Sequence, residues 1–297
     1  MSKPIIYLTG SNGFIGKNLC DDLKKDFDIK PLQLKKYDSG EFYYELPNSS
    51  ANVGENSQKI LIHCAGLAHD NKSLQYSLYK SSNVHLTERV LKLAVSLDID
   101  TFIFMSSAKV YGEFSHNRVY SENDPSLPET PYAISKLYAE KIVQDFCKLN
   151  SINYYTLRLP VTYGESMNGN LKVFEKFAKN RVPFPFMITS NKKSMCHVLN
   201  ITSFLRAIIF ASEKNSGIYN LCDDNVYSTE DIVISCYNKL GIKRRKYFML
   251  PNILLRYISN CCPNLKLHEK LTSDLVISNS KAKELTEWLP LQSLHRK

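Results

Sequence analysis

The glycine-rich segment near the start of the chain constrains the fold more than any other feature. Ile5–Thr9 is short and apolar, like a buried strand, and Phe14–Lys25 has the apolar spacing of a helix. Glycines at this junction allow a sharp turn and the close approach of another group to the backbone. The N–H groups that open a helix attract phosphate. The segment therefore predicts a dinucleotide pyrophosphate site formed by Gly10, Asn12, Gly13, Phe14, Ile15 and Gly16.

Strand-like and helix-like segments alternate through the first half of the chain. Strands are expected over 5–9, 30–34, 41–46, 59–64, 101–106 and 154–159, and helices over 14–25, 82–96 and 130–150. Pro31 fits a sheet edge or a strand start better than a strand interior. The alternation predicts an α/β fold, a Rossmann-type doubly wound parallel sheet with helices on both faces.

The regularity fades beyond Pro160, where glycines and prolines cluster between Gly164 and Pro185. Helices are expected over 201–212 and 229–240. We therefore expect a dinucleotide-binding Rossmann domain over residues 1–160 and a smaller C-terminal, mainly substrate-binding lobe over 161–297. A segment near 196–222 is expected to return to the Rossmann domain.

Composition places the chain among ordinary globular proteins. Its 297 residues are 43% hydrophobic and 23% charged. No charged-then-apolar leader opens the sequence and no apolar run approaches the roughly 18 residues of a membrane span. The expected location is the cytoplasm, with no transmembrane segment. The eight cysteines lack paired C-x-x-C spacing, so we expect reduced thiols and no metal.

The net charge of +9 calls for an explanation. No nucleic-acid-binding motif is present, so we expect no nucleic-acid partner. The densest basic run, Lys243–Lys246, is interpreted as a solvated surface, and a ligand pyrophosphate would also favour positive charge. Leu254–Ile258 and Lys266–Lys270 mix apolar and basic residues, which keeps peripheral contact with an anionic membrane as an alternative.

A second pattern carries the chemistry. Tyr132 and Lys136 are four residues apart on an expected helix, so both side chains lie on one face. A nearby cation stabilises a phenolate and makes tyrosine a better acid–base group at neutral pH. Ser106 and Ser107 end the strand expected over 101–106, where sheets of this kind bind ligands.

Several motifs together resemble the extended short-chain dehydrogenase/reductase family over almost the whole chain. They are G-x-x-G-x-x-G from Gly10, H-x-A-G from His63, S-S-x-x-V-Y-G from Ser106, Y-x-x-x-K from Tyr132 and R-x-P-x-x-Y-G from Arg158. The resemblance implies Ser107, Tyr132 and Lys136 as catalytic residues. It implies cofactor contacts, besides the glycine loop, from Cys64, Ala65, Gly66, Asn83, Ser106, Tyr132, Lys136 and Pro160. It implies substrate contacts from Ser107, Tyr132, Asn170, Leu171 and Lys193, the last in the place of a phosphate-binding arginine.

The resemblance implies hydride transfer at a carbon of a UDP-sugar, most simply C4, with a nicotinamide cofactor. Dehydratases of the family carry Asp-Glu where this chain has Ala108 and Lys109, which argues against dehydration. We expect reduction of a UDP-4-keto-6-deoxy-N-acetylhexosamine for surface polysaccharide synthesis. A UDP-glucose or UDP-N-acetylglucosamine 4-epimerase with tightly bound NAD is the alternative, and a non-catalytic NADP sensor a lesser one.

Two lysines near the end of the second expected strand bear on the cofactor. Lys35 and Lys36 suit the 2′-phosphate of NADP(H), which we favour slightly. NAD(H) is the alternative, with Asp38 on the ribose. The sequence does not decide the oligomeric state, but helices of this family's type often pair, so a homodimer is one option.

Overall fold

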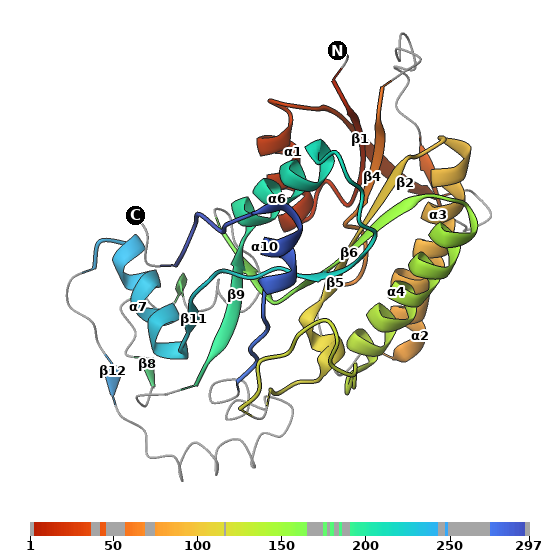
Figure 1. Ribbon diagram of the computed structural model, residues 1–297. Coiled ribbons are helices and arrows are strands. Elements are labelled where there is room, and N and C mark those ends of the chain that lie inside the picture. Colours follow the sequence, from red (N-terminus) through yellow and green to blue (C-terminus); the bar gives the residue numbers. More distant parts are fainter. Residues whose placement is uncertain are drawn as a thin grey trace.

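A seven-stranded sheet organises the molecule (Figure 1). The computed structural model describes residues 3–36, 42–45, 57–68, 75–115, 117–164, 175–176, 179–180, 184–185, 191–242, 247–248 and 274–294. The strand order is β3-β2-β1-β4-β5-β6-β10, with β3 antiparallel to β2 and the other pairs parallel. The bounds are β1 Ile5–Thr9, β2 Asp28–Lys36, β3 Phe42–Glu45, β4 Lys59–His63, β5 Thr101–Ser107, β6 Asn153–Leu159 and β10 Gly217–Asn220. The predicted Rossmann-type fold class is confirmed.

Helices cover both faces of this sheet, as Figure 1 shows. One face carries α1 (Phe14–Leu23), α6 (Val198–Phe210) and α10 (Ser280–Thr286). The other carries α3 (Leu86–Ser96) and α4 (Pro131–Leu149). Strand side chains alternate between two cores, because successive residues of a strand point to opposite faces. On β5, Ile103 and Met105 join the α1–α6 core, whereas Phe102 and Phe104 join the α3–α4 core.

Two expected elements differ from the structure. The strand expected over 30–34 runs from Asp28 to Lys36, so Pro31 lies inside it, opposite Leu8 of β1. Proline's fixed φ is compatible with a strand, and the buried Leu32 keeps this segment on the sheet. The helix expected from Ser82 begins earlier, as α2 (Tyr76–Tyr79) and a π-helical turn η1 (Lys80–His85) that leads into α3.

The later part of the chain returns to the large sheet. β10 pairs with β6, and α6, which precedes it, packs against α1. A three-stranded sheet contains β7 (Val161–Tyr163), β9 (Lys193–His197) and β11 (Val226–Tyr227), and a two-stranded one contains β8 (Phe184–Pro185) and β12 (Tyr247–Phe248). Helix α7 (Thr229–Lys239) follows β11. The domain boundary at residue 160 stays a prediction.

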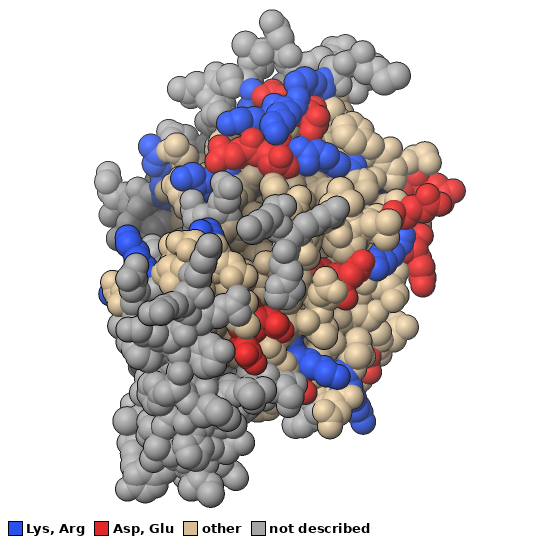
Figure 2. All heavy atoms as spheres, turned by 90° about the vertical axis from the view of Figure 1, so that its left-hand side faces the viewer, with Lys and Arg blue, Asp and Glu red and all other residues tan. Residues whose placement is uncertain are grey.

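Charged side chains of both signs share the described surface. Figure 2 shows Lys and Arg groups beside Asp and Glu groups in the upper part of the visible face. Ion pairs on α1, such as Lys24 with Asp21 and Lys25 with Asp22, are of this kind. Within the described residues, no helix has the length and apolar character needed to cross a bilayer. The predicted basic run Lys243–Lys246 and the segments 254–258 and 266–270 lie outside the described residues.

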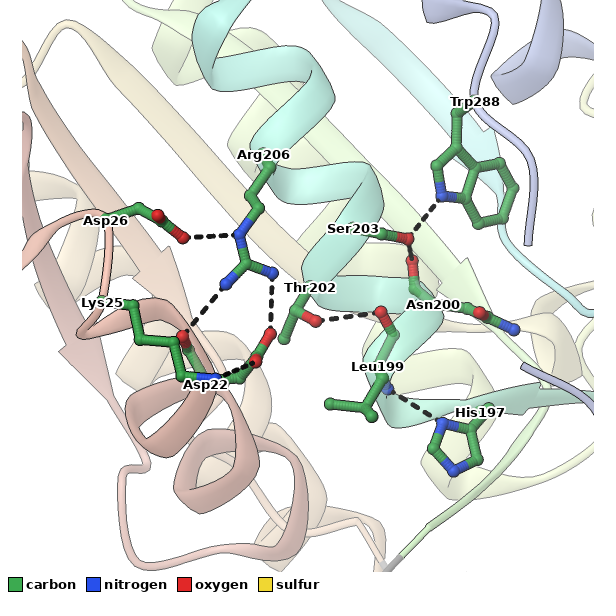
Figure 3. A network of polar contacts seen from close by, with 10 residues as sticks. All are labelled: Asp22, Lys25, Asp26, His197, Leu199, Asn200, Thr202, Ser203, Arg206 and Trp288. Atoms are coloured by element: carbon green, nitrogen blue, oxygen red, sulfur yellow. Dashed lines mark hydrogen bonds and ion pairs between the residues drawn. The ribbon is translucent and has the colours of Figure 1, made fainter. Parts of the chain in front are cut away.

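Helix α6 is tied to α1 by one arginine (Figure 3). Arg206 donates from Nε to Asp26 and from Nη1 to Asp22, both at 2.7 Å, and from Nη2 to the Asp22 carbonyl at 3.0 Å. At the other side of α6, Trp288 donates to the Ser203 hydroxyl at 2.8 Å. These contacts fix α6 between the first helix and the C-terminal segment.

Candidate active site

The glycine loop is built from backbone contacts that exclude side chains. A Cβ on Gly16 would lie 2.2 Å from the Gly10 carbonyl oxygen, and one on Gly10 would lie 2.7 Å from the Ala65 nitrogen. Gly10 also has φ +71°, a left-handed conformation that favours glycine. Gly13 donates to the Gly10 carbonyl at 3.0 Å and precedes the first residue of α1. The loop therefore brings the start of α1 close to the ends of β1 and β4.

The start of α1 fits a phosphate. No side chain among the described residues caps this helix. A Cβ on Gly13 would meet, among the described residues, the Gly10 oxygen alone within 4 Å, at 3.3 Å, so the described part of the chain leaves this backbone open. Uncapped N–H groups, the positive end of a helix and an open cradle are what a pyrophosphate requires. The residues present thus fit a dinucleotide cofactor.

The loop after β4 is held by Asn83. Its Oδ1 accepts from the Leu67 N–H at 2.7 Å, and its Nδ2 donates to the Ser135 hydroxyl at 2.9 Å. A Cβ on Gly66 would lie 2.7 Å from the same Oδ1. Asn83 is 2% exposed, so its amide serves as a bridge between this loop and α4. Asn83 thus holds this loop in place, and the cofactor contact that the resemblance implies for it stays a prediction.

Buried polar groups connect the end of β4 to its neighbours. His63 lies between two hydroxyls, with Nδ1 2.7 Å from Thr9 Oγ1 and Nε2 3.0 Å from Thr87 Oγ1. Burial, aided by the charge of Lys136, lowers the pKa of His63 to about 3, so the ring is neutral at physiological pH. Burial raises the pKa of the Cys64 thiol to about 12. Neither group titrates near neutrality.

Helix α4 presents the tyrosine–lysine pair. It begins as expected, with the Thr130 hydroxyl accepting from the Ala133 N–H at 3.3 Å and proline next in the chain. Tyr132 is half-buried, and its ring meets that of Tyr79 edge to face at 6.2 Å between centroids. Lys136 is buried, and its ammonium lies 4.1 Å from the centroid of the Phe104 ring. The aromatic face stabilises a cation that has lost most of its water.

Opposing influences set the pKa of Lys136. Burial lowers its pKa to about 8, while the negative charge of Glu140 and the Cys64 side chain oppose the shift. The ammonium form is therefore the majority at neutral pH. Phe104, under the Lys136 ammonium, pairs with His63 of β4, so Lys136 lies near the end of β4, and Ala65 just beyond it adjoins Gly10. The structure thus brings the predicted lysine to the predicted cofactor loops.

The predicted serines lie at the carboxyl end of β5. Ser107 is 8% exposed and caps a short 3-10 helix, η2 (Ala108–Tyr111), by accepting from the Lys109 N–H at 3.3 Å. Ser106 points instead to α4, where it donates to Glu140 Oε1 at 2.5 Å. Ser106 therefore anchors the helix that carries Tyr132 and Lys136, and Ser107 is the hydroxyl left at the edge of the sheet.

Lys193, predicted to bind substrate, begins β9 and pairs with Tyr227 of β11. Burial lowers its pKa to about 8, with Asp274 raising and the charge of Lys109 lowering it. Lys109 in turn forms an ion pair with Glu113 at 3.0 Å. Asp274 accepts from the Lys192 N–H at 2.6 Å and, through its carbonyl, from the Ser115 N–H at 2.8 Å, so the start of β9 adjoins the segment that follows η2. Its role toward substrate stays a prediction.

The structure says less about the remaining predicted site residues. Asn170, Leu171 and Asp38 lie outside the described residues. Lys35 is exposed near the end of β2, and Lys36 is the last residue of that strand. Pro160 lies between β6 and β7 and is half-buried.

One buried ion pair was not foreseen from the sequence. Arg158 donates from Nη2 to Glu140 Oε2 at 2.7 Å and from Nε to both carboxylate oxygens, and each residue is 3% exposed. Burial would lower the pKa of Arg158, but the hydrogen bonds and charge of Glu140 outweigh it and raise the pKa. One feature of the sequence could have indicated this pair. Glu140 is an acidic residue on the face of α4 that also carries the buried Ala139, Val143 and Cys147.

A second buried carboxylate holds the turn after β6. Asp223 accepts from the Tyr163 hydroxyl at 2.5 Å, the His197 N–H at 2.9 Å and the Asn200 amide at 2.7 Å. Burial raises its pKa, and these hydrogen bonds oppose the shift. His197 caps α6 and packs against Tyr163, which is a structural role.

Comparison with known proteins agrees with this geometry. UDP-glucose 4-epimerase of Vibrio cholerae is 28% identical over 309 residues, with 99% of this chain and 93% of that protein covered. The structure of UDP-N-acetylglucosamine 4-epimerase from Bacillus cereus superposes with a TM-score of 0.76 at 18% identity, covering 98% of this chain and 95% of that one. UDP-glucuronic acid 4-epimerase from Bacillus cereus, in complex with UDP-glucuronic acid and NAD, gives 0.74 at 18% identity, covering 98% and 95%. The predicted resemblance is confirmed by the sequence profile that matches residues 6–222: the chain belongs to the NAD dependent epimerase/dehydratase family.

Proposed function

We propose that this protein is a UDP-hexose 4-epimerase that uses NAD. The observation that carries the proposal is the buried Lys136 on one helix face with Tyr132, held beside the Ser106–Ser107 strand end and the glycine loop. The relatives named above, which span nearly the whole chain, are 4-epimerases. The 4-epimerase now stands ahead of the 4-ketoreductase, which the sequence analysis had preferred.

The residues divide the work as follows. Tyr132 removes the proton of the sugar 4-hydroxyl and later returns a proton to the same oxygen. The Lys136 ammonium stabilises the phenolate and holds a ribose of the cofactor, and Ser107 donates a hydrogen bond to the reacting oxygen. A nicotinamide dinucleotide held by the glycine loop and Lys136 would supply the hydride chemistry at C4. Lys193 is the proposed anchor for the diphosphate of the substrate.

We propose NAD over NADP as the resident cofactor. The family and the structure with bound NAD support this choice. The NADP(H) preference drawn from Lys35 and Lys36 has no support in these comparisons, and Lys35 is exposed on β2. Dissociation constants for NADH and NADPH test the choice, and tighter binding of NADPH would refute it.

The test of the activity uses purified protein first analysed for bound nucleotide by acid release. UDP-glucose and UDP-N-acetylglucosamine are each supplied alone, and the C4 epimers are followed by proton NMR. We expect interconversion without net change at 340 nm. Tyr132→Phe should lower kcat by about 10²-fold or more while NAD binding persists. Unchanged activity in this variant would remove Tyr132 from the chemistry and favour the sensor alternative.

The 4-ketoreductase is the second candidate, and the two lysines at the end of β2 are the feature that favours it. The assay supplies a UDP-4-keto-6-deoxy-N-acetylhexosamine with NADPH. Stoichiometric loss of nicotinamide absorbance, with no epimerisation in the first assay, would establish reduction in place of epimerisation.

We further propose that two copies pair through α2 and α4. Tyr76 and Leu78 of α2 are 38% and 49% exposed, and Tyr138 of α4 is 57% exposed. Helices α2 and α4 are in contact, and the charge of Tyr138 contributes to the raised pKa of Tyr76. The exposed side chains of the two helices therefore form one surface. A joined apolar face on paired helices suits a homodimer contact.

A further inference from the structure

Two matched pairs of residues join α4 to β5. Lys136 and Glu140 are one turn apart on one face of α4. Phe104 and Ser106 are two residues apart on β5, so they share a face of the strand. Lys136 lies over the Phe104 ring at 4.1 Å, and Glu140 accepts from Ser106 at 2.5 Å. The carboxylate and the ammonium therefore lie in the same interface between α4 and β5.

Glu140 is held in one position by four hydrogen bonds. Ser106 bonds Oε1, and Arg158 of β6 bonds both oxygens at 2.7–3.2 Å. Arg158 is fixed in turn by the Tyr111 ring, 4.7 Å from its guanidinium carbon, and Tyr111 donates to Asn220 at 2.9 Å. Such a carboxylate cannot swing toward solvent when a neighbouring charge changes.

We propose that Glu140 is a positioning residue for the reaction, a fixed buried counter-charge that keeps Lys136 an ammonium beside Tyr132. The inference rests on the proposed role of Tyr132 and Lys136. The buried Arg158 guanidinium needs this carboxylate as a partner, and a buried lysine without water also needs a negative charge nearby to stay charged.

Among the described residues whose charge acts on Lys136, Glu140 is the carboxylate. From β4 come His63, neutral at physiological pH, and Cys64, whose thiol has its pKa raised to about 12 by burial. From α4 itself come Tyr132 and Glu140. Burial lowers the pKa of Lys136, and Glu140 is the strongest opposing charge. Loss of that charge would let Lys136 deprotonate at a lower pH.

The test compares three variants by urea unfolding and by the pH dependence of kcat. Glu140→Gln keeps the shape of the side chain and removes its charge, but it also leaves Arg158 without the carboxylate that it pairs with. Glu140→Gln with Arg158→Met removes both charges of the pair and keeps the volume. Asp22→Asn removes a carboxylate from the other arginine cluster, on α1. It controls for the loss of an ion pair as such.

We expect Glu140→Gln to lose stability and to shift the alkaline limb of the kcat–pH profile, where activity changes as Lys136 deprotonates, to lower pH by about one unit or more. The double variant should regain stability and keep this shift. Asp22→Asn should leave the kcat–pH profile unchanged. A double variant with both stability and limb restored would show that Glu140 serves only as the partner of Arg158, and an unmoved limb in both Glu140 variants would also overturn the proposal.

A readout without turnover separates this proposal from the proposed function. NADH binding to nucleotide-free protein is titrated by fluorescence across the same pH range, since a charged donor holds the ribose more tightly than a neutral amine. A shift to lower pH in the NADH affinity of the Glu140 variants supports the positioning role even if no UDP-sugar is epimerised. An unshifted NADH affinity, when the wild-type enzyme is active, refutes the positioning role alone.

Discussion

At the scale of single residues, the glycine loop makes the sharpest prediction. A methyl group on Gly16 would meet two backbone atoms of Gly10 at 2.2 and 2.7 Å, and neither can rotate away. Gly16→Ala should therefore displace the loop at a cost of about 1–3 kcal/mol and weaken NAD binding by about tenfold or more. Isothermal titration checks this. Gly217→Ala, with nearest atoms at 3.6 Å, is the control that should bind normally.

His63 predicts a specific loss of stability in acid. Its folded pKa of about 3 lies below the ordinary value of 6.5, so the unfolded state binds the proton first as pH falls. The stability it supplies is complete above pH 6.5 and declines toward pH 3. Between pH 7.5 and 5.5 the loss should be about 1.4 kcal/mol.

The measurement is the free energy of unfolding in urea at both pH values, for the wild type and for His63→Gln. The glutamine does not titrate, so the wild type should lose about 1.4 kcal/mol more than the variant. Equal losses would mean that the His63 ring titrates with the same pKa in the folded and the unfolded protein, which would refute the prediction.

At the scale of elements, the sequence predicted those that local rules determine. The five residues of β1, the cap and start of α4 at Thr130, and the catalytic spacing on that helix agree with the structure. Turn glycines, a capping hydroxyl and apolar periodicity act over a few residues, so they can be read from the chain.

What was missed depends on contacts between distant segments. Pro31 lies within a strand because β1 pairs alongside it, and the π-helical turn Lys80–His85 has no local signal. The Glu140–Arg158 pair joins residues 18 positions apart. The bridge that the Asn83 amide forms between a loop and a helix was likewise not foreseen, because the two segments become neighbours only on folding.

The junction of α1 and α6 carries its own prediction. Arg206→Met keeps the packing of the stem but removes three hydrogen bonds to Asp22 and Asp26. Because the groups are partly exposed, the loss should be about 1 kcal/mol, and 1 M salt should reduce it. Urea midpoints at two salt concentrations check this. Lys239→Met, which breaks a pair with Glu175, should change the midpoint less.

At the scale of the whole molecule, the described part of the face in Figure 2 carries charges of both signs. The chain carries +9, but the described basic groups in the upper part of Figure 2 stand beside acidic ones. Paired charges of this kind weaken the long-range field that draws a polyanion to a protein.

The proposed dimer is tested at this scale. Tyr138→Glu combined with Leu78→Glu would bury two charges at the contact between copies. Sedimentation velocity should show a dimer for the wild type and a monomer for the double variant. Leu149→Glu, at 84% exposure near the other end of α4, is the matched control and should stay dimeric. A wild-type monomer would end the proposal.

The position of β10 governs how this chain can be divided. It closes the side of β6 and arrives only after α6, so the sheet is completed by residues more than fifty positions beyond β6. A fragment ending near residue 160 would leave the backbone of β6 unpaired along one edge and uncover the apolar face under α6. Exposed edges of this kind recruit strands from other molecules. Insoluble fragments are the expected product of limited proteolysis or truncation there, and recombining halves between relatives would have to carry α6 and β10 together with the first six strands.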